Sequence, residues 1–236
     1  LPPNTPKPHD SLLAPSSLVF VESKTKNLND FSQWWRLQKE VNWKQPYGKE
    51  STIDTILDHP VIHVSWDDAV AYCKWKGRRL PTEAEYEYAM RSGNSNTTYT
   101  WGNQSIDTGE QKANVWQGDF PSNNMVLDDF YYTSPVKSFG DNDFGLYDIS
   151  GNVWEWCSDL YHSDYYSTIS NKVANNPKGP TKSFDPNDPF SSKRVMRGGS
   201  FLCNDSYCSG FRNSMRMKST PDSSSQHVGF RTVLDL

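Results

Sequence analysis

Two cysteines near the C-terminal end, Cys203 and Cys208, lie five positions apart in a run that opens with a glycine pair. They are half of the four cysteines in the chain. This spacing does not suit one face of a helix, so a loop or a strand edge must bring the sulfurs together. Two soft sulfur ligands with no histidine nearby in the sequence suit Cu(I), and redox chemistry on a substrate thiol is the second natural use.

A local disulfide is an equally weighted alternative, because two cysteines this close in sequence often bond to each other. A zinc site is a weaker alternative. Cys73 and Cys157 are isolated in the sequence, and neither belongs to a C-x-x-C motif that could supply a second pair of ligands. The spacing alone therefore leaves both the copper pair and the disulfide open.

Two other stretches have the residue types of a calcium site, because Ca2+ takes hard oxygen ligands, including backbone carbonyls. The first stretch contains Asn114, Val115, Asp128 and Phe130, and the second contains Asp148, Gly151, Val153 and Glu155. Neither matches an EF-hand, and solvated turns are the alternative. The second stretch is too aromatic for an ordinary exposed turn, which favours a structured site.

The composition bounds the possible classes of protein. The 236 residues can hold one large or two small domains, and 14% of them are aromatic against a hydrophobic fraction of only 35%. We expect a core built from large rings. A formal charge of -4 gives no electrostatic reason to expect nucleic acid, and no apolar run is long enough to predict a membrane span. We expect a monomer.

Two helices should precede the segments that carry these groups. The first begins after Ser65, a good N-cap, and ends at Gly77. The second begins with Thr82 and Glu85 in capping-box spacing and runs to Gly93. After it, short aromatic and β-branched runs between turn residues predict a small mixed sheet with long loops.

The remaining segments predict one α+β domain over residues 18–236. Residues 1–17 are proline-rich and are expected to form an extended lead-in, followed by a strand at 18–21. Residues 28–47 predict an irregular segment anchored by aromatic side chains, and residues 163–193 predict a surface loop.

With these residues assembled, the chain resembles the formylglycine-generating enzymes of the sulfatase-modifying factor family from about His59 to Arg231, and more loosely from Ser17. The matching blocks, in chain order, are His-Pro-Val at 59–61, His-Val-Ser-Trp at 63–66, Arg-Leu-Pro-Thr-Glu-Ala-Glu at 79–85, Trp-Gly-Asn at 101–103, Gly-Leu-Tyr at 145–147, Gly-Asn-Val-Trp-Glu-Trp at 151–156, Arg-Gly-Gly-Ser at 197–200, Thr-Pro-Asp-Ser at 220–223 and Gly-Phe-Arg at 229–231. Most blocks are shared by the whole superfamily. The Cys203/Cys208 spacing after Gly-Gly-Ser is the specific mark of its catalytic members.

The resemblance implies a variant of the C-type lectin fold, low in regular secondary structure and stabilised by calcium. It also implies a copper-dependent oxidase that uses O2 to convert a cysteine to Cα-formylglycine. The cysteine lies in a Cys-x-Pro-x-Arg segment of an unfolded sulfatase polypeptide. The compartment stays open between the endoplasmic reticulum lumen and a bacterial periplasm or cytoplasm.

Site roles follow from the resemblance residue by residue. Cys203 and Cys208 would bind Cu(I), with Ser200 and Tyr207 lining the pocket and Trp154 packing near the substrate thiol. Substrate binding would fall to Ser17, His227 and Trp154. The two calcium sites would be the two oxygen-rich stretches, where Asp148 replaces an amide and should strengthen the hold on a cation.

The chain departs from the family pattern at several positions. Met90, Asn213 and Thr232 stand where vertebrate-type enzymes have disulfide cysteines, and only Cys73 is retained. We expect Cys73 and the additional Cys157 to be buried thiols. Asn204 replaces a histidine of a related enzyme, and His227 replaces an asparagine that helps to hold substrate, so peptide recognition should differ. From the resemblance we expect no counterpart here of the family segment before the Ser17 region, so either this chain is a fragment whose remainder lies elsewhere or the fold begins differently.

Two other functions compete with the oxidase. A lectin-like domain without catalysis would bind a peptide or a glycan, but an inert binder gains nothing from a reactive thiol pair unless the pair forms a disulfide. An iron-dependent sulfoxide synthase on the same scaffold would need a histidine-rich iron site. The five histidines of the chain form no suitable cluster in the sequence.

Overall fold

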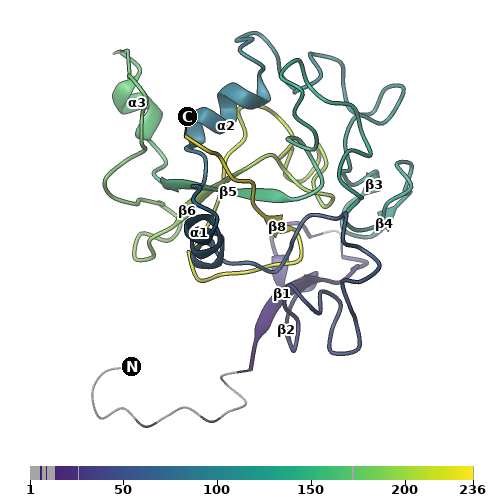
Figure 1. The fold of residues 1–236 in the computed structure, drawn as a ribbon. Coiled ribbons are helices and arrows are strands. Elements are labelled where there is room, and N and C mark those ends of the chain that lie inside the picture. The colour runs from purple at the N-terminus through teal and green to yellow at the C-terminus, as the bar shows by residue number, and fades with distance from the viewer. Residues whose placement is uncertain (1–5, 7–8, 10–13, 26, 172, 236) are drawn as a thin grey trace.

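A four-stranded mixed sheet forms the centre of the computed structural model (Figure 1). The structure describes residues 6, 9, 14–25, 27–171 and 173–235. The sheet order is β7-β6-β5-β8, and its strands are β5 (Trp154–Leu160), β6 (Arg194–Arg197), β7 (Met217–Ser219) and β8 (Val228–Gly229). β6 pairs antiparallel with β5 and β7, whereas β8 pairs parallel with β5. The predicted small mixed sheet is confirmed.

The two predicted helices are confirmed, together with their start signals. α1 (Trp66–Trp75) begins after the N-cap Ser65, and α2 (Glu83–Met90) begins after the N-cap Thr82. The N-terminus of each helix carries a complete capping box. This motif satisfies backbone N–H groups that the first turn of a helix leaves unpaired. α2 ends three residues before Gly93, earlier than expected.

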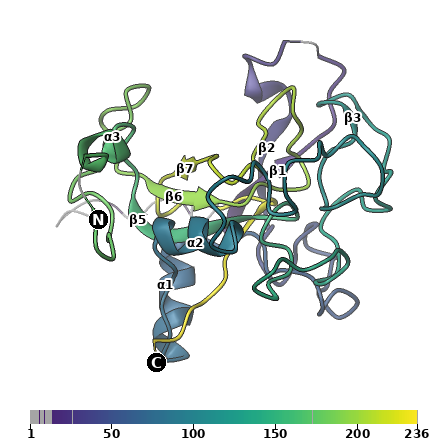
Figure 2. The same ribbon diagram turned by 90° about the horizontal axis from the view of Figure 1, so that it is seen from above.

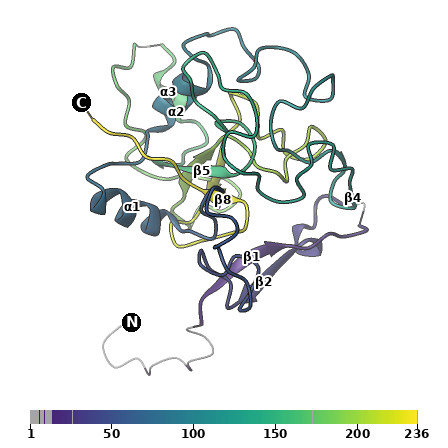
Figure 3. The same ribbon diagram turned by 45° about the vertical axis from the view of Figure 1, so that its right-hand side comes forward.

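A long hairpin forms the N-terminal part of the fold. β1 (Ser16–Phe20) pairs antiparallel with β2 (Trp35–Lys39), and a 3-10 turn (Phe31–Gln33) lies between them. In Figure 3 the hairpin lies below the rest of the molecule. The predicted strand at 18–21 is confirmed with shifted bounds. The irregular segment predicted for 28–47 is wrong over β2, because Trp35–Lys39 pair in antiparallel register with β1.

The boundaries of the predicted lead-in also shift. β1 begins at Ser16, so the last two residues of the 1–17 segment belong to a strand. The backbone of Leu18 donates to Ser224 O and accepts from Gln226 N, which ties this hairpin to the C-terminal segment. Residues 1–5, 7, 8 and 10–13 of the expected lead-in lie outside the described residues.

The segment 163–193 is more ordered than the surface loop predicted for it. It contains α3 (Tyr165–Ile169), and Figure 2 shows this helix beside the end of the central sheet. Asp185 is buried and accepts from the ammonium groups of Lys193 and Lys218 at 2.7 and 3.2 Å. Lys193 directly precedes β6 and Lys218 lies on β7, so the two ion pairs attach the segment to the central sheet.

Aromatic rings dominate the core, as the composition predicts. Trp34, Trp116, Trp154 and Trp156 are among the largest fully buried side chains. Cys73 and Cys157 are free buried thiols, which confirms the expectation for both. Within the described part of the chain, no helix is long and apolar enough to cross a bilayer.

A second small hairpin, β3 (Gly118–Asp119) with β4 (Asn123–Asn124), lies close to the loop that carries Cys208. The side chain of Asn204 donates from Nδ2 to Gly118 O at 2.9 Å. The hairpin therefore anchors the thiol loop from outside the central sheet.

Candidate active site

A mainly apolar cleft of about 620 Å3 lies over one face of the central sheet. Its walls come from the N-terminal hairpin, from β5 to β7, from the segment before β8 and from the thiol loop. The lining residues are Leu18, Phe31, Trp35, Phe120, Trp154, Trp156, Met196, Ser200, Leu202, Cys203, Tyr207, Cys208, Met215, Met217, Lys218, Ser219, Ser223, Ser224, Ser225, His227 and Val228. Six of the seven residues expected at the catalytic and substrate site are among them.

Cys203 and Cys208 both line the cleft and are joined as a disulfide, with their Cα atoms 5.4 Å apart. The local disulfide that the spacing left open is therefore the form in the structure. A tight turn produces the contact, because Asn204 O accepts from the backbone N–H groups of Tyr207, Cys208 and Ser209. Cys203 is fully buried, whereas Cys208 is half-buried at the cleft.

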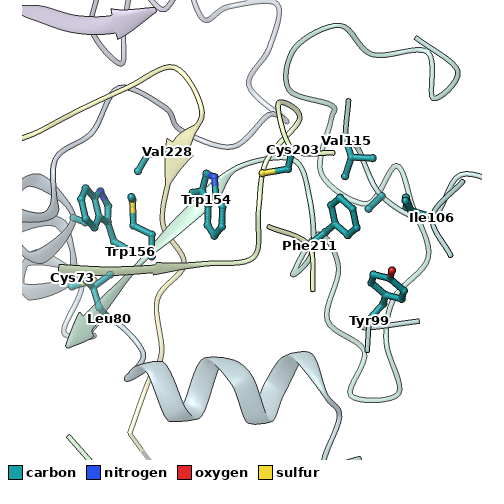
Figure 4. Packing of buried hydrophobic residues seen from close by; sticks show 13 residues of the cluster. Cys73, Leu80, Tyr99, Ile106, Val115, Trp154, Trp156, Cys203, Phe211 and Val228 are labelled. Carbon is teal, nitrogen blue, oxygen red and sulfur yellow. The ribbon is translucent and has the colours of Figure 1, made fainter. Parts of the chain in front are cut away.

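Trp154 forms the inner wall beside Cys203. Figure 4 shows Trp156, Trp154 and Cys203 following one another through the core, with the Cys203 sulfur directed toward Trp154. Gly210 passes close to both, since a Cβ at this position would lie 2.5 Å from Trp154 Cζ2 and 2.7 Å from Cys203 Sγ. Only glycine allows this approach of backbone to ring and sulfur.

Ser200 connects His227 to the thiol pair. Its hydroxyl lies 3.2 Å from His227 Nδ1 and 3.8 Å from Cys203 Sγ. Burial, with a smaller repulsion from His63, lowers the pKa of His227 to about 3. The imidazole is therefore neutral near pH 7 and packs edge-on against Trp35, with ring centroids 4.8 Å apart.

Tyr207 is held by two rings on the far side of the thiol loop. It stacks on Phe120 with ring centroids 4.3 Å apart and meets Trp34 edge-on at 5.6 Å. Burial raises the pKa of Tyr207, so the phenol stays protonated at neutral pH. Tyr207 thus lines the cleft and also anchors the turn that carries Cys208.

Ser17 does not line the cleft, although its neighbour Leu18 does. The Ser17 hydroxyl is buried, lies 2.7 Å from His63 Nδ1 and accepts from Ser224 Oγ at 2.9 Å. His63 Nε2 lies 2.9 Å from Pro46 O and must donate to it, so neutral His63 accepts from Ser17 through Nδ1. Since Ser224 lines the cleft, Ser17 is one hydrogen bond away from it.

The first oxygen-rich stretch forms a cluster that fits a calcium ion. The side-chain oxygen of Asn114 is buried and has no hydrogen-bond partner. The Asp128 carboxylate is 5% exposed, and its hydrogen bonds come from neutral donors, Gln117 Nε2 and the backbone N–H groups of Val115 and Phe130. Burial raises the pKa of Asp128. The unpaired amide oxygen of Asn114 and the buried Asp128 carboxylate, which accepts from the backbone N–H of the next residue, Val115, are suitable donors for a hard cation.

The second stretch has its negative charge already matched. Arg231 donates to both oxygens of Glu155, at 2.5 and 2.7 Å, and to the backbone oxygen of Asp148 at 3.2 Å. The Asp148 carboxylate accepts from the backbone N–H of Lys137 at 2.7 Å. A cation at this stretch would share Glu155 with an arginine, so the first stretch is the better fit.

Among the described residues, no group of three or more His, Cys, Asp and Glu side chains is placed to hold a metal. A sulfoxide synthase would need a histidine-rich iron site, and the described residues do not form one. A soft metal in the cleft would have the two sulfurs as its cysteine ligands.

Three parts of the cleft wall were not predicted from the sequence. Leu18, Phe31 and Trp35 reach it from the N-terminal hairpin, and Phe120 comes from the loop after β3. No local pattern marks these residues, because their role depends on contacts with segments far away in the chain. The third part, a row of methionines, has a local signal in the alternation of Met215 and Met217.

Comparison with known proteins gives one family. A family model described as the sulfatase-modifying factor enzyme 1-like domain matches residues 17–236. The chain is 47% identical over 217 residues to a formylglycine-generating enzyme from Bos taurus, a match that covers 91% of this chain and 54% of that protein. It is also 39% identical over 211 residues to a protein of Mus musculus named inactive C-alpha-formylglycine-generating enzyme 2, covering 88% of this chain and 59% of that protein.

The fold is similar to a solved structure as well. PvdO from Pseudomonas aeruginosa matches 90% of this chain and 70% of its own chain, with a TM-score of 0.57 and 22% sequence identity. This likeness supports the fold alone. The chain spans about half the length of the curated relatives described above.

Proposed function

The chain belongs to the sulfatase-modifying factor enzyme 1-like family, and on this basis we propose that it is a copper-dependent oxidase of peptidyl cysteine. Its substrate is a cysteine in a Cys-x-Pro-x-Arg segment of an unfolded sulfatase polypeptide, and its product is Cα-formylglycine. O2 is the oxidant. The chain acts as a monomer.

The observation that carries this proposal is the position of the thiol pair. Cys203 and Cys208 meet at the inner part of an apolar cleft beside Trp154, where a peptide cysteine could approach them. In an inert peptide-binding paralogue the pair would serve only as a structural disulfide, whereas the oxidase needs two reduced thiols at this place in the cleft. Among the described residues that line the cleft, none carries a carboxylate. The ligands that remain favour a soft metal ion over a hard one.

Cu(I) requires the reduced form of the pair, since a disulfide sulfur is a poor metal ligand. Bound to Cys203 and Cys208, Cu(I) would supply an electron for the reduction of O2 and a third position for the substrate sulfur. The proposal therefore requires a thiol reductant to open the Cys203–Cys208 disulfide before the metal binds.

The surrounding side chains position the substrate. The Trp154 ring excludes water from the inner wall, and Trp35 and Leu18 close the cleft from the hairpin side. The Ser200 hydroxyl donates to the Cys203 sulfur, which carries no proton as a disulfide or as a metal-bound thiolate, and it accepts from Nδ1 of neutral His227. Because the reacting C–H bond adjoins the substrate sulfur, holding that sulfur at the pair supplies much of the selectivity.

The overall reaction needs an external reductant. The cysteine side chain becomes an aldehyde and its sulfur leaves as hydrogen sulfide, which removes two electrons from the substrate. Reduction of O2 to water takes four electrons. An external thiol, oxidised to a disulfide, supplies the remaining pair.

The test uses a synthetic Cys-x-Pro-x-Arg peptide incubated with O2, a thiol reductant and the Cu(I)-loaded protein. We expect mass spectrometry to show the aldehyde with wild type and unchanged peptide with Cys203→Ser or Cys208→Ser. Cys73→Ala, which removes a buried thiol outside the cleft lining, is the matched control and should retain activity. An unreacted peptide with reduced, copper-loaded wild type would reject the proposal in favour of a binding paralogue.

We also propose that Ca2+ stabilises the fold through Asn114, Val115, Asp128 and Phe130. The support is the buried amide oxygen of Asn114, which lacks a partner, next to the buried Asp128 carboxylate. Asp148, Gly151, Val153 and Glu155 form the second proposed calcium site, in competition with Arg231 for the charge of Glu155.

A further inference from the structure

Three of the five methionines in the chain line the cleft that contains the thiol pair. They are Met196 on β6, Met217 on β7 and Met215 just before β7. The other two lie elsewhere: Met90 is buried at the end of α2, and Met125 is 55% exposed outside the cleft.

Strand register brings these thioethers together. Met196 pairs directly with Met217 across β6 and β7, and on its other side Met196 pairs with Trp156 of β5. Side chains that are directly opposite in an antiparallel pair lie on one face, with Cβ atoms about 4.5–5.5 Å apart. Met215 lies two residues before Met217, so an extended chain places it on the same face.

The exposure of the row rises from the core to the mouth of the cleft. Met196 is 3% exposed and packs in the same core cluster as Cys203, whereas Met215 and Met217 are 36% and 37% exposed. Filling gaps in the core is the usual role of methionine, but Met215 and Met217 lie at the solvent-facing end of the row, outside the core. The row therefore leads from solvent toward the thiol pair.

The chemistry of the row matches a soft monovalent ion. Thioether sulfur selects Cu(I) and Ag(I) over hard cations, and the cleft lining in the described part of the chain includes no carboxylate to bind a hard competitor. Trp156, in the same cross-strand row, adds an aromatic ring that can attract a cation through its face. Lys218, which also lines the cleft, is paired with Asp185 at 3.2 Å.

We propose that Met196, Met215 and Met217 form a thioether site for Cu(I) that extends from the mouth of the cleft inward. The site captures the ion and passes it inward to Cys203 and Cys208. Its role in loading rests on the proposed function, but its ability to bind a soft ion does not.

The experiment separates the two sites by removing the thiol pair. In a Cys203→Ser/Cys208→Ser background, we titrate the protein with Ag(I) under a competing chelator and measure stoichiometry and affinity by calorimetry. We expect one bound ion. Adding Met215→Leu/Met217→Leu, which keeps side-chain volume but removes two thioethers, should weaken binding at least about tenfold. Cys73 and Cys157 remain buried in every variant and give a constant background.

Met125→Leu in the same background is the matched control and should leave Ag(I) affinity unchanged. Equal affinity in the Met215→Leu/Met217→Leu variant, or no binding in the parent background, would show that the row is only an apolar wall. Either result would leave the oxidase proposal intact. Conversely, failure of reduced wild type to convert peptide would not alter the Ag(I) result.

Discussion

Ser200 and Asn204 illustrate how single side chains prepare the thiol pair. Ser200 lies between His227 and Cys203, and because the Cys203 sulfur carries no proton, the hydroxyl donates to this sulfur and accepts from His227 Nδ1. Asn204 closes the turn through its backbone oxygen and fastens the turn to Gly118 through its amide. The asparagine that replaces a family histidine therefore has a defined task in this chain.

The first prediction concerns Asn204→Ala. The change removes the donor to Gly118 O and the side-chain acceptor of the Tyr207 N–H, so the turn loses two restraints. We expect a loss of about 1–2 kcal/mol in denaturant unfolding and weaker Cu(I) binding by the reduced protein in chelator competition. Ser206→Ala, which removes only an exposed donor to Asn204, is the control. Unaltered Cu(I) affinity in Asn204→Ala would remove the positioning role.

The second prediction concerns pH and His63. Burial lowers the pKa of His63 from 6.5 to about 4, so between these values the unfolded state binds a proton that the folded state does not. Stability should therefore fall as pH falls through this window, by up to about 1.4 kcal/mol per pH unit. Denaturant unfolding at pH 7 and pH 5 measures the slope. His63→Gln should show a shallower slope, and an identical slope would exclude His63 as its source.

At the scale of elements, a buried ion network holds α2 against β6. The Arg197 guanidinium is fully buried and contacts Glu83 at 3.1 Å and Glu87 at 2.7 Å, while Glu83 also accepts from Arg216 at 2.6 and 2.9 Å. Arg197 precedes the glycine pair that leads to Ser200. The network thus orients the strand end from which the thiol loop begins.

The third prediction tests this network with Glu83→Gln. Neutralising Glu83 leaves Arg197 and Arg216 without the carboxylate that they share in the interior, and breaking a buried pair in this way costs about 3–5 kcal/mol. Thermal and denaturant unfolding should both register the loss. Glu110→Gln removes an exposed carboxylate paired only with Lys112 and should change stability by less than about 0.5 kcal/mol. Similar stability of the two variants would contradict the structural role.

At the scale of the whole molecule, long irregular segments are held by a few polar clusters, because regular structure is confined to short elements. Asn114 connects the segment after the second helix to the loop before the central sheet, because its backbone oxygen accepts from Asn152 N. A cation at Asn114, Val115, Asp128 and Phe130 would cross-link the two ends of the segment 114–130. Calcium should therefore affect global stability more than it affects the cleft.

The fourth prediction is that chelation of calcium lowers the melting temperature of wild type. Calcium at a hundred times its dissociation constant adds about 2.7 kcal/mol to the free energy of unfolding. This corresponds to several degrees of melting temperature for a chain of this size. Calorimetry with and without chelator measures the shift. Asp128→Asn should melt lower and lose most of its response to calcium, whereas exposed Asp54→Asn should respond as wild type does. A wild-type melting temperature that chelator leaves unchanged would remove the calcium assignment but not the copper one.

The sequence by itself determined the features that depend on neighbouring residues. The N-cap at Ser65, the capping box at Thr82, the closeness of Cys203 and Cys208, and the family motifs are all readable within a few positions, because each rests on local geometry or local chemistry. Only the tertiary structure decided the rest. Leu18, Trp35 and Phe120 become cleft walls, and Met196 meets Met217, through pairings between distant segments. Such pairings are set by the packing of the whole core, so no short stretch of the chain carries a signal for them.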